Sequence, residues 1–263
     1  MNAVRTIDAV VLAGRRPGRD VLLGDSGVAT KALLPIAGRP MLLHVTAALQ
    51  ATPLIGRIII LAQDSAALAR HPDLAALAND TRVEFADSGA GISMSLAKLV
   101  GTVTAPLLVT TADNVLLTPA MVADFLGESS GSDVAVAMVE RANLIARYPG
   151  SRRTWLKFRG GWWSGANLFR FGGRQVLPLL DFWSAIEQDR KKGLRIIAAF
   201  GPALLLATLL RLITIQQGVQ RAARRFGLVD ARVVAMRQPE ACIDADKPDD
   251  IVLIEQILKS RAG

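Results

Sequence analysis

Residues 11–40 read VLAGRRPGRDVLLGDSGVATKALLPIAGRP, and this stretch decides the fold. An apolar strand ends in Ala13-Gly14 and leads into a loop that carries three arginines. Glycine has no Cβ and lets the backbone approach a ligand closely, while arginines bring hydrogen-bond donors and positive charge to phosphate oxygens. The stretch therefore predicts a strand followed by a loop that holds a triphosphate.

The loop has neither of the two common phosphate-binding spacings. A Walker A loop needs G-x-x-x-x-G-K-[ST], and a dinucleotide-binding loop needs G-x-G-x-x-G at the start of a helix. The glycines at positions 14, 18, 24 and 27 fit neither pattern. A lone lysine, Lys31, and a second turn expected at Gly38-Arg39-Pro40 follow instead. The spacing indicates a phosphate site of another type.

Apolar runs alternate with amphipathic stretches, which predicts a doubly wound, mostly parallel α/β sheet. Expected strands are residues 9–13, 56–62, 82–86, 106–111 and 134–139, and expected helices are residues 40–49, 64–77, 93–100, 119–126 and 251–258. Ligands of such sheets bind outside the carboxyl ends of the strands. The strand ends at Gly14 and at Thr110 to Asn114 are therefore the predicted site.

These features resemble the N-terminal signature of the sugar-phosphate nucleotidyltransferase superfamily, which includes molybdenum-cofactor nucleotidyltransferases and methylerythritol-phosphate cytidylyltransferases. Its pattern is L-A-x-G, a short basic loop and K-x-L-x-x-x-x-G-x-P, with a more basic and stiffer RRPGR loop here at residues 15–19. The resemblance implies a glycosyltransferase-A-like fold. It assigns nucleotide binding to Leu12, Ala13, Gly14, Arg15, Arg16 and Gly18, and catalysis to Arg19, Lys31 and Asp113.

Asp113 is the strongest single candidate for a metal ligand. It follows the apolar strand LLVTTAD, so its carboxylate is expected at the sheet edge, where Mg²⁺ beside a nucleotide needs hard oxygen ligands. Residues 111–118 resemble the second motif of the same superfamily, whose aspartate binds that metal. The alternative is that Asp113 caps the next turn, with Asn114 as its partner.

A second carboxylate is expected from the stretch ACIDADKPDD, residues 241–250. This stretch resembles the family's D-x-D-x-P-x-D-L ending, which makes Asp246 the first candidate for the second metal ligand and Asp244 the next. Asp249 and Asp250 precede or begin the last predicted helix, where acidic side chains complement the helix dipole. The four acids thus divide into two candidates for metal binding and two for structure.

Two further segments resemble substrate-binding loops of the superfamily. DSGAGISMSL, residues 87–96, is similar to its nucleobase loop and puts forward Ser88, Gly89 and Ser95, although Ser93 or Ser95 could equally be a helix N-cap. SGAN, residues 164–167, is similar to its acceptor loop and puts forward Gly165 and Asn167. Trp162-Trp163 just before it predict either a pocket wall or a packed hairpin.

The resemblance implies transfer of NMP from an NTP, with CTP favoured, to a phosphorylated sugar, polyol or lipid-headgroup precursor, with Mg²⁺ and release of pyrophosphate. Such a reaction needs charge neutralisation and alignment rather than a covalent nucleophile. Two rivals stay open. A nucleotide-sugar-dependent glycosyltransferase would share the sheet and the metal, and a non-catalytic nucleotide sensor would explain the altered loop at residues 15–19.

Composition narrows the classes of protein. The 263 residues, 51% of them apolar, fit a single NTP-transferase domain with a divergent insertion at about 150–235. The one cysteine, Cys242, excludes an internal disulfide and favours the cytoplasm. The net charge of +8 suits anionic substrates better than nucleic acid, because the chain has no interleaved aromatic platform. Cys242, His44 and His71 are expected to be structural.

The stretch IIAAFGPALLLATLLRLITI, residues 196–215, raises the question of a membrane. Gly201-Pro202 and Arg211 interrupt it, and the remaining helix, residues 203–213, is too short to span a bilayer. Its basic flanks favour peripheral contact at the inner face of the membrane through residues 190–225, whereas its apolar length favours a buried helix or a homodimer contact. A transmembrane span is not expected.

Overall fold

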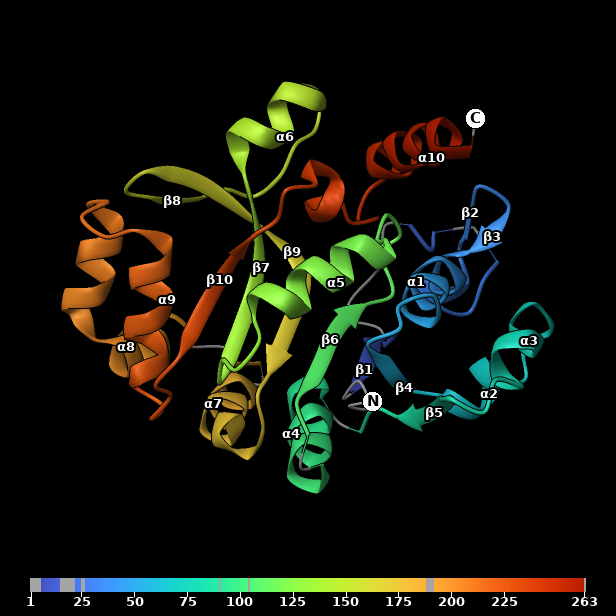
Figure 1. The fold of residues 1–263 in the computed structure, drawn as a ribbon, viewed down its shortest axis with the longest axis horizontal. Coiled ribbons are helices and arrows are strands. Elements are labelled where there is room, and N and C mark those ends of the chain that lie inside the picture. Colours follow the sequence, from blue (N-terminus) through green and yellow to red (C-terminus); the bar gives the residue numbers. More distant parts are fainter. Residues whose placement is uncertain are drawn as a thin grey trace, which may run out of the picture.

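The computed structural model describes residues 6–14, 22–24, 27–89, 91–103, 105–187 and 192–262 (Figure 1). The strands are β1 Ile7–Leu12, β2 Pro35–Ile36, β3 Arg39–Pro40, β4 Ile55–Ala62, β5 Val83–Asp87, β6 Leu107–Thr111, β7 Val134–Glu140, β8 Leu156–Phe158, β9 Gly161–Phe171 and β10 Ala231–Ala235. The α-helices are α1 Met41–Gln50, α2 Ser65–Ala69, α3 Ala75–Ala78, α4 Ile92–Thr102, α5 Pro119–Glu128, α6 Arg141–Arg147, α7 Leu177–Glu187, α8 Lys192–Leu209, α9 Ile215–Arg224 and α10 Pro248–Ala262.

The main sheet has the order β10-β7-β9-β6-β1-β4-β5, with β8 paired to β9. Strand β1 runs parallel to β4 and β6, β4 to β5, and β7 to β10. Only β9 opposes its neighbours β6, β7 and β8. This arrangement confirms the predicted doubly wound, mostly parallel α/β sheet.

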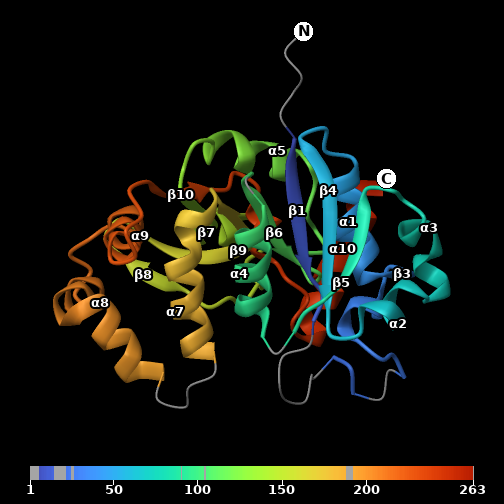
Figure 2. The same ribbon diagram turned by 90° about the horizontal axis from the view of Figure 1, so that it is seen from below.

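Helices cover both faces of the sheet, as Figures 1 and 2 show from two directions. The alternating side chains of β1 enter two separate cores. Ala9 and Val11 pack into the core that includes α1 and α5, whereas Val10 packs into the core that includes α4 and α7. A strand that is buried on both faces explains the continuous apolar run of β1, since a parallel strand covered by helices has no solvent side.

The predicted helix at residues 64–77 is wrong as a single element. Helix α2 ends at Ala69, a 3-10 turn spans Pro72–Leu74, and α3 begins at Ala75. His71 has an extended backbone, with φ −65° and ψ 129°. A proline disfavours the helical conformation of the preceding residue and offers no amide hydrogen, so His71-Pro72 divides the helix.

No strand is expected from the sequence between residues 152 and 173, yet this segment contains the β8–β9 hairpin. Strand β9 has 11 residues and lies between β6 and β7, and its pairing with both neighbours compensates for the weak strand pattern of its sequence. The Trp162 ring lies 4.4 Å from the Lys157 ammonium and 5.1 Å from the Arg141 guanidinium carbon. The tryptophan pair therefore belongs to a packed hairpin rather than to a pocket wall.

Helix α8 confirms the expected interruption at Gly201, whose φ of 75° and ψ of 153° are not helical. The helix ends at Leu209, earlier than the predicted residue 213, and Arg211 follows with a φ of 54°. Within the described ranges, no helix is both long enough and apolar enough to cross a membrane.

Candidate active site

The carboxyl ends of β1 and β6 lie side by side. The Ala112 amide donates to the Leu12 carbonyl over 3.0 Å, and the Ala13 amide donates to the Leu61 carbonyl over 2.8 Å. These bonds extend the strand pairing by one residue beyond each strand. The residues that follow Ala13 and Ala112 are Gly14 and Asp113. They therefore leave the sheet at the same edge, as predicted.

Gly14 lies close to the Gln63 side chain and does not have an unusual backbone angle. Its φ is not in the left-handed region. A Cβ built on Gly14 would lie 3.1 Å from the side-chain nitrogen of Gln63, which follows β4. Of the other residues predicted to bind the nucleotide phosphates, Arg15, Arg16, Gly18 and Arg19 lie outside the described residues.

Lys31 begins a 3-10 turn, Lys31–Leu33, that precedes the β2–β3 hairpin. The hairpin turn has Ala37 at φ 48° and Gly38 at φ 75°, a conformation that glycine adopts without steric cost. The Ala37 amide donates to the Glu255 carboxylate on α10 over 2.8 Å. The predicted turn after Lys31 is confirmed, and it connects this segment to the last helix.

The Lys31 ammonium lies between two carboxylates from distant parts of the chain. Its Nζ is 3.1 Å from Asp113 Oδ2 and 2.7 Å from Asp246 Oδ1. The Ala245 amide also donates to the Asp113 carbonyl over 3.0 Å. The structure therefore brings together three residues that the sequence separates by 82 and 215 positions.

Asp113 faces the site and not the following turn. Its second carboxylate oxygen accepts a hydrogen bond from the Thr111 hydroxyl. Asn114, the partner expected if Asp113 only capped the turn, is buried and donates its amide to the Ala166 carbonyl over 3.2 Å and to Thr110 Oγ1 over 3.3 Å. These contacts leave Asp113 available to Lys31 and to a ligand.

The two carboxylates keep Lys31 charged. Burial by itself lowers the pKa of Lys31, but the negative charges of Asp113 and Asp246 and their hydrogen bonds outweigh it, so the pKa is raised above 10.5. The Lys31 side chain retains 19% of its exposure. A protonated ammonium, partly accessible, therefore stands at the strand ends.

Asp244 has surroundings different from those of Asp246. Its carboxylate accepts hydrogen bonds from the Arg153 guanidinium and, over 3.2 Å, from the Asn167 amide. Burial, followed by the nearby Asp246 and Asp113 charges, raises the pKa of Asp244 to about 6, with Arg153 opposing them. Asp244 thus lies next to the metal candidates but faces the predicted acceptor loop.

Arg153 is a site residue that the sequence did not single out. It is buried and joins Asp244 to Asp250, which lie 91 and 97 positions later in the chain. Asp250 also accepts the backbone amides of Lys247 over 3.1 Å and Asp246 over 3.3 Å. Asp250 therefore fixes the loop before α10, which agrees with the structural role expected for it.

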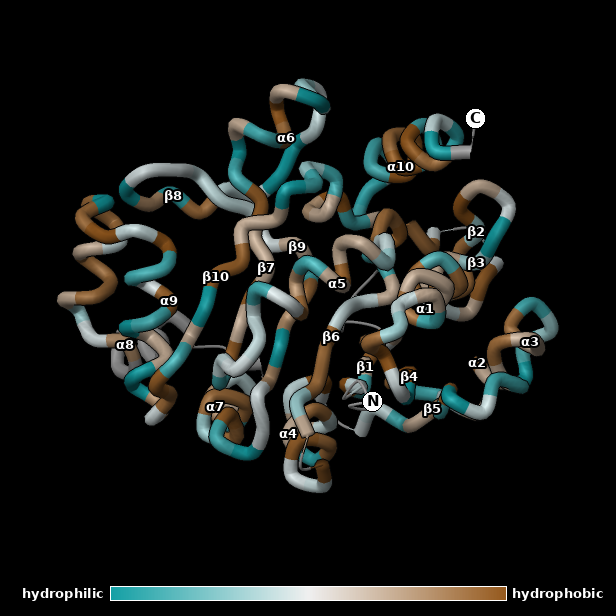
Figure 3. The backbone as a smooth tube through the Cα atoms, in the orientation of Figure 1, coloured by the Kyte–Doolittle hydropathy of each residue, from teal (hydrophilic) through white to brown (hydrophobic). Residues whose placement is uncertain are grey.

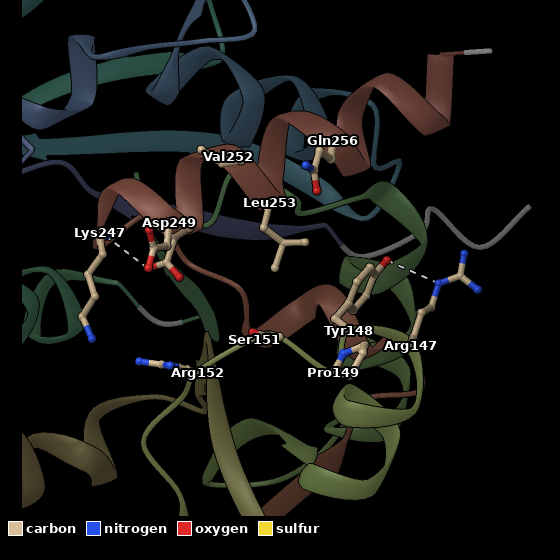
Figure 4. A pocket seen from close by; sticks show the side chains of 12 residues that line it. Arg147, Tyr148, Pro149, Ser151, Arg152, Lys247, Asp249, Val252, Leu253 and Gln256 are labelled. Atoms are coloured by element: carbon tan, nitrogen blue, oxygen red, sulfur yellow. Dashed lines mark hydrogen bonds between the residues drawn. The ribbon is translucent and has the colours of Figure 1, made fainter.

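Two neighbouring cavities open beside these residues. A cavity of about 430 Å³ is lined by residues that include Gly165, Asn167, Asp244 and Asp246. A second cavity of about 680 Å³ lies between α6 and the start of α10 (Figure 4). Arg152, Lys247 and Asp250 line both cavities. The predicted acceptor residues therefore adjoin the carboxylates, with room for a small molecule.

The predicted nucleobase loop follows β5. The Ser88 amide donates to the Ala62 carbonyl over 2.7 Å, and the Ser88 hydroxyl is buried with no hydrogen-bond partner among the described residues. A Cβ on Gly89 would be 3.9 Å from the Ser95 hydroxyl, which donates to the Gly91 carbonyl over 2.9 Å. Gly91 is the N-cap of α4, so neither Ser93 nor Ser95 has that role.

The cysteine and the two histidines, Cys242, His44 and His71, lie among contacts typical of residues that stabilise the fold. Cys242 is buried, and burial raises the pKa of its thiol to about 12. The His44 ring nitrogen Nε2 lies 3.0 Å from the Ile36 carbonyl, and burial lowers the pKa of His44. His71 Nδ1 accepts the Asp73 amide over 3.4 Å. These contacts agree with the structural roles expected for the three residues.

The donor set at Lys31 suits a hard divalent cation. Asp113 and Asp246 supply carboxylate oxygens, the ligands that Mg²⁺ prefers, and they already converge on one positive charge. No cluster of three or more histidine, cysteine, aspartate or glutamate side chains is arranged for a metal in the part of the chain that the structure describes. Two protein ligands fit Mg²⁺, which usually completes its shell with water and substrate phosphates.

Comparison with known protein families shows which family the chain belongs to. The family model of the MobA-like NTP transferase domain matches residues 9–226. The chain belongs to the MobA-like NTP transferase family. It is a nucleotidyltransferase enzyme, and the match includes Lys31 and Asp113. A search of curated proteins found no match.

Solved structures resemble this NTP transferase over nearly the whole chain. A hypothetical transferase from Thermus thermophilus has 26% identity and a TM-score of 0.77, with 94% of this chain and 99% of that chain covered. CMP:2-keto-3-deoxy-manno-octonic acid synthetase complexed with CTP has 12% identity and a TM-score of 0.58, with 98% of this chain and 99% of that chain covered. 4-Diphosphocytidyl-2C-methyl-D-erythritol synthase from Anaerococcus prevotii has 11% identity and a TM-score of 0.57, with 98% of this chain and 100% of that chain covered. The last two show a shared fold.

Proposed function

We propose that this enzyme transfers a nucleoside monophosphate from CTP to a phosphorylated sugar, polyol or lipid-headgroup precursor and releases pyrophosphate. The observation that carries the proposal is the Lys31 ammonium held between Asp113 and Asp246 at the ends of β1 and β6. The cavity that contains Asn167 opens beside the same carboxylates. A cationic centre next to a polar cavity suits a reaction between two phosphorylated substrates.

The chemistry requires charge neutralisation at the α-phosphate. A phosphate oxygen of the acceptor forms the new bond to the α-phosphorus, the bond to the β-phosphate bridging oxygen breaks, and pyrophosphate carries away the electron pair. Lys31, protonated as its raised pKa indicates, stabilises negative charge on the phosphates. No general base is needed, because a phosphate dianion with a second pKa of about 6 is already deprotonated at neutral pH.

Asp113 and Asp246 would hold Mg²⁺, with Asp244 as the neighbouring carboxylate. A divalent cation bound there would supply further positive charge to the nucleotide phosphates and help to align them. Lys31 competes with it for the same two carboxylates, since both oxygen contacts to Nζ are 3.1 Å or shorter. In the loaded enzyme Mg²⁺ would therefore replace Lys31 at one or both of these carboxylates.

Arg152 and Lys247 are the proposed ligands of the acceptor phosphate. Figure 4 shows their side chains extending from opposite walls toward the same end of the cavity. Both residues line the two cavities, and neither forms an ion pair with any residue in the described ranges. Asn167 and Gly165 would contact a hydroxyl or phosphate of the acceptor from the floor of the smaller cavity.

The preference for CTP rests on relatives and on the loop at Ser88. Two of the structural neighbours of low identity are a CMP-sugar-acid synthetase with CTP bound and a diphosphocytidyl synthase. The Ser88 hydroxyl, which has no partner among the described residues, would donate a hydrogen bond to a base edge when the nucleotide opens this loop, with Gly89 and Ser95 nearby. We further propose that residues 1–263 form one NTP-transferase domain that acts in the cytoplasm.

Pyrophosphate release tests the proposal. The enzyme is assayed with Mg²⁺, each of CTP, GTP, UTP and ATP, and a panel of sugar and polyol phosphates. Asp113→Asn, which keeps the side-chain shape, is compared with Asp181→Asn, an exposed aspartate on α7. Acceptor-dependent release that only Asp113→Asn abolishes supports the proposal. Nucleotide binding without release under any combination favours a sensor, and turnover of a nucleotide sugar favours a glycosyltransferase.

A further inference from the structure

Helices α8 and α9 form one end of the molecule, beyond β10 (left side of Figure 1), and α7 lies between them and α4. Three aromatic rings, from α7, from α8 and from the residues after α9, hold them together. Phe182 of α7 lies 5.5 Å from Phe200 of α8 and 5.0 Å from Phe226, which follows α9. The Phe200 and Phe226 rings are 6.0 Å apart. These contacts fix one side of α8 against its neighbours.

Apolar side chains gather where α8 ends and the chain turns toward α9. Leu206, Leu209, Leu210 and Leu212 are 54%, 78%, 57% and 58% exposed. They make up four of the nine large apolar side chains that are exposed in the described part of the chain. Single exposed leucines are ordinary, but four within seven positions form a patch of the kind that marks an interaction site.

The same segment carries the whole net charge of the protein. Residues 190–229 contain eight of the 31 lysines and arginines and none of the 23 aspartates and glutamates. The other 23 basic residues balance the 23 acids elsewhere in the chain, so the net +8 resides here. Arg211, Arg221, Arg224 and Arg225 are exposed, and none forms an ion pair with a residue that the structure describes.

The basic and apolar residues lie on the same two helices and the turn that joins them. Arg211 lies between Leu210 and Leu212 in the turn after α8. Arg225 reaches back to α8, because its guanidinium lies 3.3 Å from the position that a Cβ on Gly201 would take. Figure 3 shows apolar segments on α8 beside hydrophilic segments of α9. We define these four leucines and four arginines as the α8–α9 surface.

We propose that the α8–α9 surface docks on an anionic lipid bilayer. Leucines enter the interface between headgroups and acyl chains, and arginines attract the negative surface charge of the membrane. A second copy of this chain fits less well, since the same uncompensated positive charges would face each other across a two-fold contact. Nucleic acid would satisfy the arginines but would leave the leucines in water.

Vesicle sedimentation tests this docking. The full-length protein is mixed with phosphatidylcholine vesicles, with or without phosphatidylglycerol, and we expect binding only to the anionic vesicles, weakening as salt rises. Leu209→Ser with Leu212→Ser should lose binding, whereas Leu209→Met with Leu212→Met should keep it. Arg221→Ala, Arg224→Ala and Arg225→Ala together should weaken binding about a hundredfold, because each basic residue contributes about fivefold.

A charge-matched control separates a local surface from a general attraction. Arg70, Lys98 and Lys259 are exposed on α2, α4 and α10 or at their ends, and changing all three to alanine lowers the net charge equally. The proposal is overturned if this control weakens binding as much, if neutral vesicles bind equally, or if the protein stays in the supernatant. A lipid-free dimer that Leu209→Ser and Leu212→Ser dissociate would also overturn it. Nucleotidyl transfer to a water-soluble acceptor should remain in all these variants.

Discussion

Lys31 is the residue on which the proposed chemistry depends most. Its ammonium is shared by Asp113 and Asp246, and these acids keep it protonated although it is largely buried. A permanent positive charge that is already aligned needs no reorganisation when the substrate becomes more negative. In the same arrangement, Asp113 and Asp246 both have the Lys31 ammonium as a cationic partner.

Lys31→Met removes this charge and keeps the length of the side chain. We expect kcat to fall about 10²–10³-fold, as it does when a single charge-stabilising group is removed from an active site. We also expect tighter binding of Mg²⁺ in the absence of nucleotide, because Lys31 no longer competes for Asp113 and Asp246. Steady-state kinetics and metal titration measure the two effects. Lys98→Met, at an exposed position on α4, should change neither, and an unchanged kcat in Lys31→Met would contradict the role.

Ser88 offers a second residue-scale prediction, since its buried hydroxyl has no partner among the described residues. If the nucleobase supplies that partner, Ser88→Ala should raise KM for the nucleotide about three- to tenfold, the value of one neutral hydrogen bond, with kcat unchanged. Thermal stability should not fall. Ser129, another buried serine with an unpartnered hydroxyl, is the matched control, and Ser129→Ala raising KM equally would rule out a local effect.

Asp133 ties three elements together at the start of β7. Its carboxylate accepts the Val229 and Asp230 amides over 2.7 and 3.0 Å and the Gln175 side-chain amide over 3.1 Å. The Asp230 amide, followed by the Val229 amide and Gln175, holds the pKa of Asp133 below 3.8 in spite of burial. Asp133 therefore stabilises the folded protein above that pH, and this contribution is lost as the pH falls through the lower folded pKa.

Asp133→Asn should lower the free energy of unfolding by about 1–3 kcal/mol at neutral pH, because it replaces hydrogen bonds to a charged group. The difference from the natural protein should shrink well below pH 3.8. Urea unfolding at neutral and acid pH gives both values. Asp181→Asn serves as the control, and a difference that persists unchanged in acid would show that the charge of Asp133 does not matter.

The strands were more predictable from the sequence than the order in which they pair. Strand β1 and strand β6 are short apolar runs that end in small or polar residues, and both were predicted. Strand β9 was not, because glycines and polar residues at Gly161 to Asn167 hide its period, and only pairing with β6 and β7 makes it a strand. Local pattern cannot report a partner that lies far along the chain.

At the scale of the whole molecule, the candidate site also has a part that local motifs predict and a part that they do not. Lys31, Asp113 and Asp246 were proposed from motifs at strand ends, and the fold places them in contact. Arg153 was missed because it lies in a segment without a motif, and because its partners Asp244 and Asp250 are 91 and 97 positions away in the sequence. Arg15, Arg16, Gly18 and Arg19 lie outside the described residues and stay predictions.

Nucleotide binding should stabilise the whole molecule. A ligand at a hundred times its Kd adds about 2.7 kcal/mol to the free energy of unfolding, which corresponds to about 5–10 °C in Tm for a chain of this size. We expect this shift with the preferred NTP and Mg²⁺ together and a smaller one with either alone. Differential scanning fluorimetry measures it. Asp113→Asn should reduce the shift, and an equal shift in that variant would place the nucleotide elsewhere.

The most direct measurement follows the α-phosphate of the nucleotide. The enzyme is given an NTP labelled at the α-phosphate, Mg²⁺ and the acceptor that releases pyrophosphate, and the labelled products are separated. Transfer at the Lys31 site predicts that the label moves to the acceptor in a one-to-one ratio with pyrophosphate, that Lys31→Met slows the transfer about 10²–10³-fold, and that Asp113→Asn abolishes it. Label recovered only as free nucleoside monophosphate, or transfer that proceeds at an unchanged rate in both variants, would contradict the account.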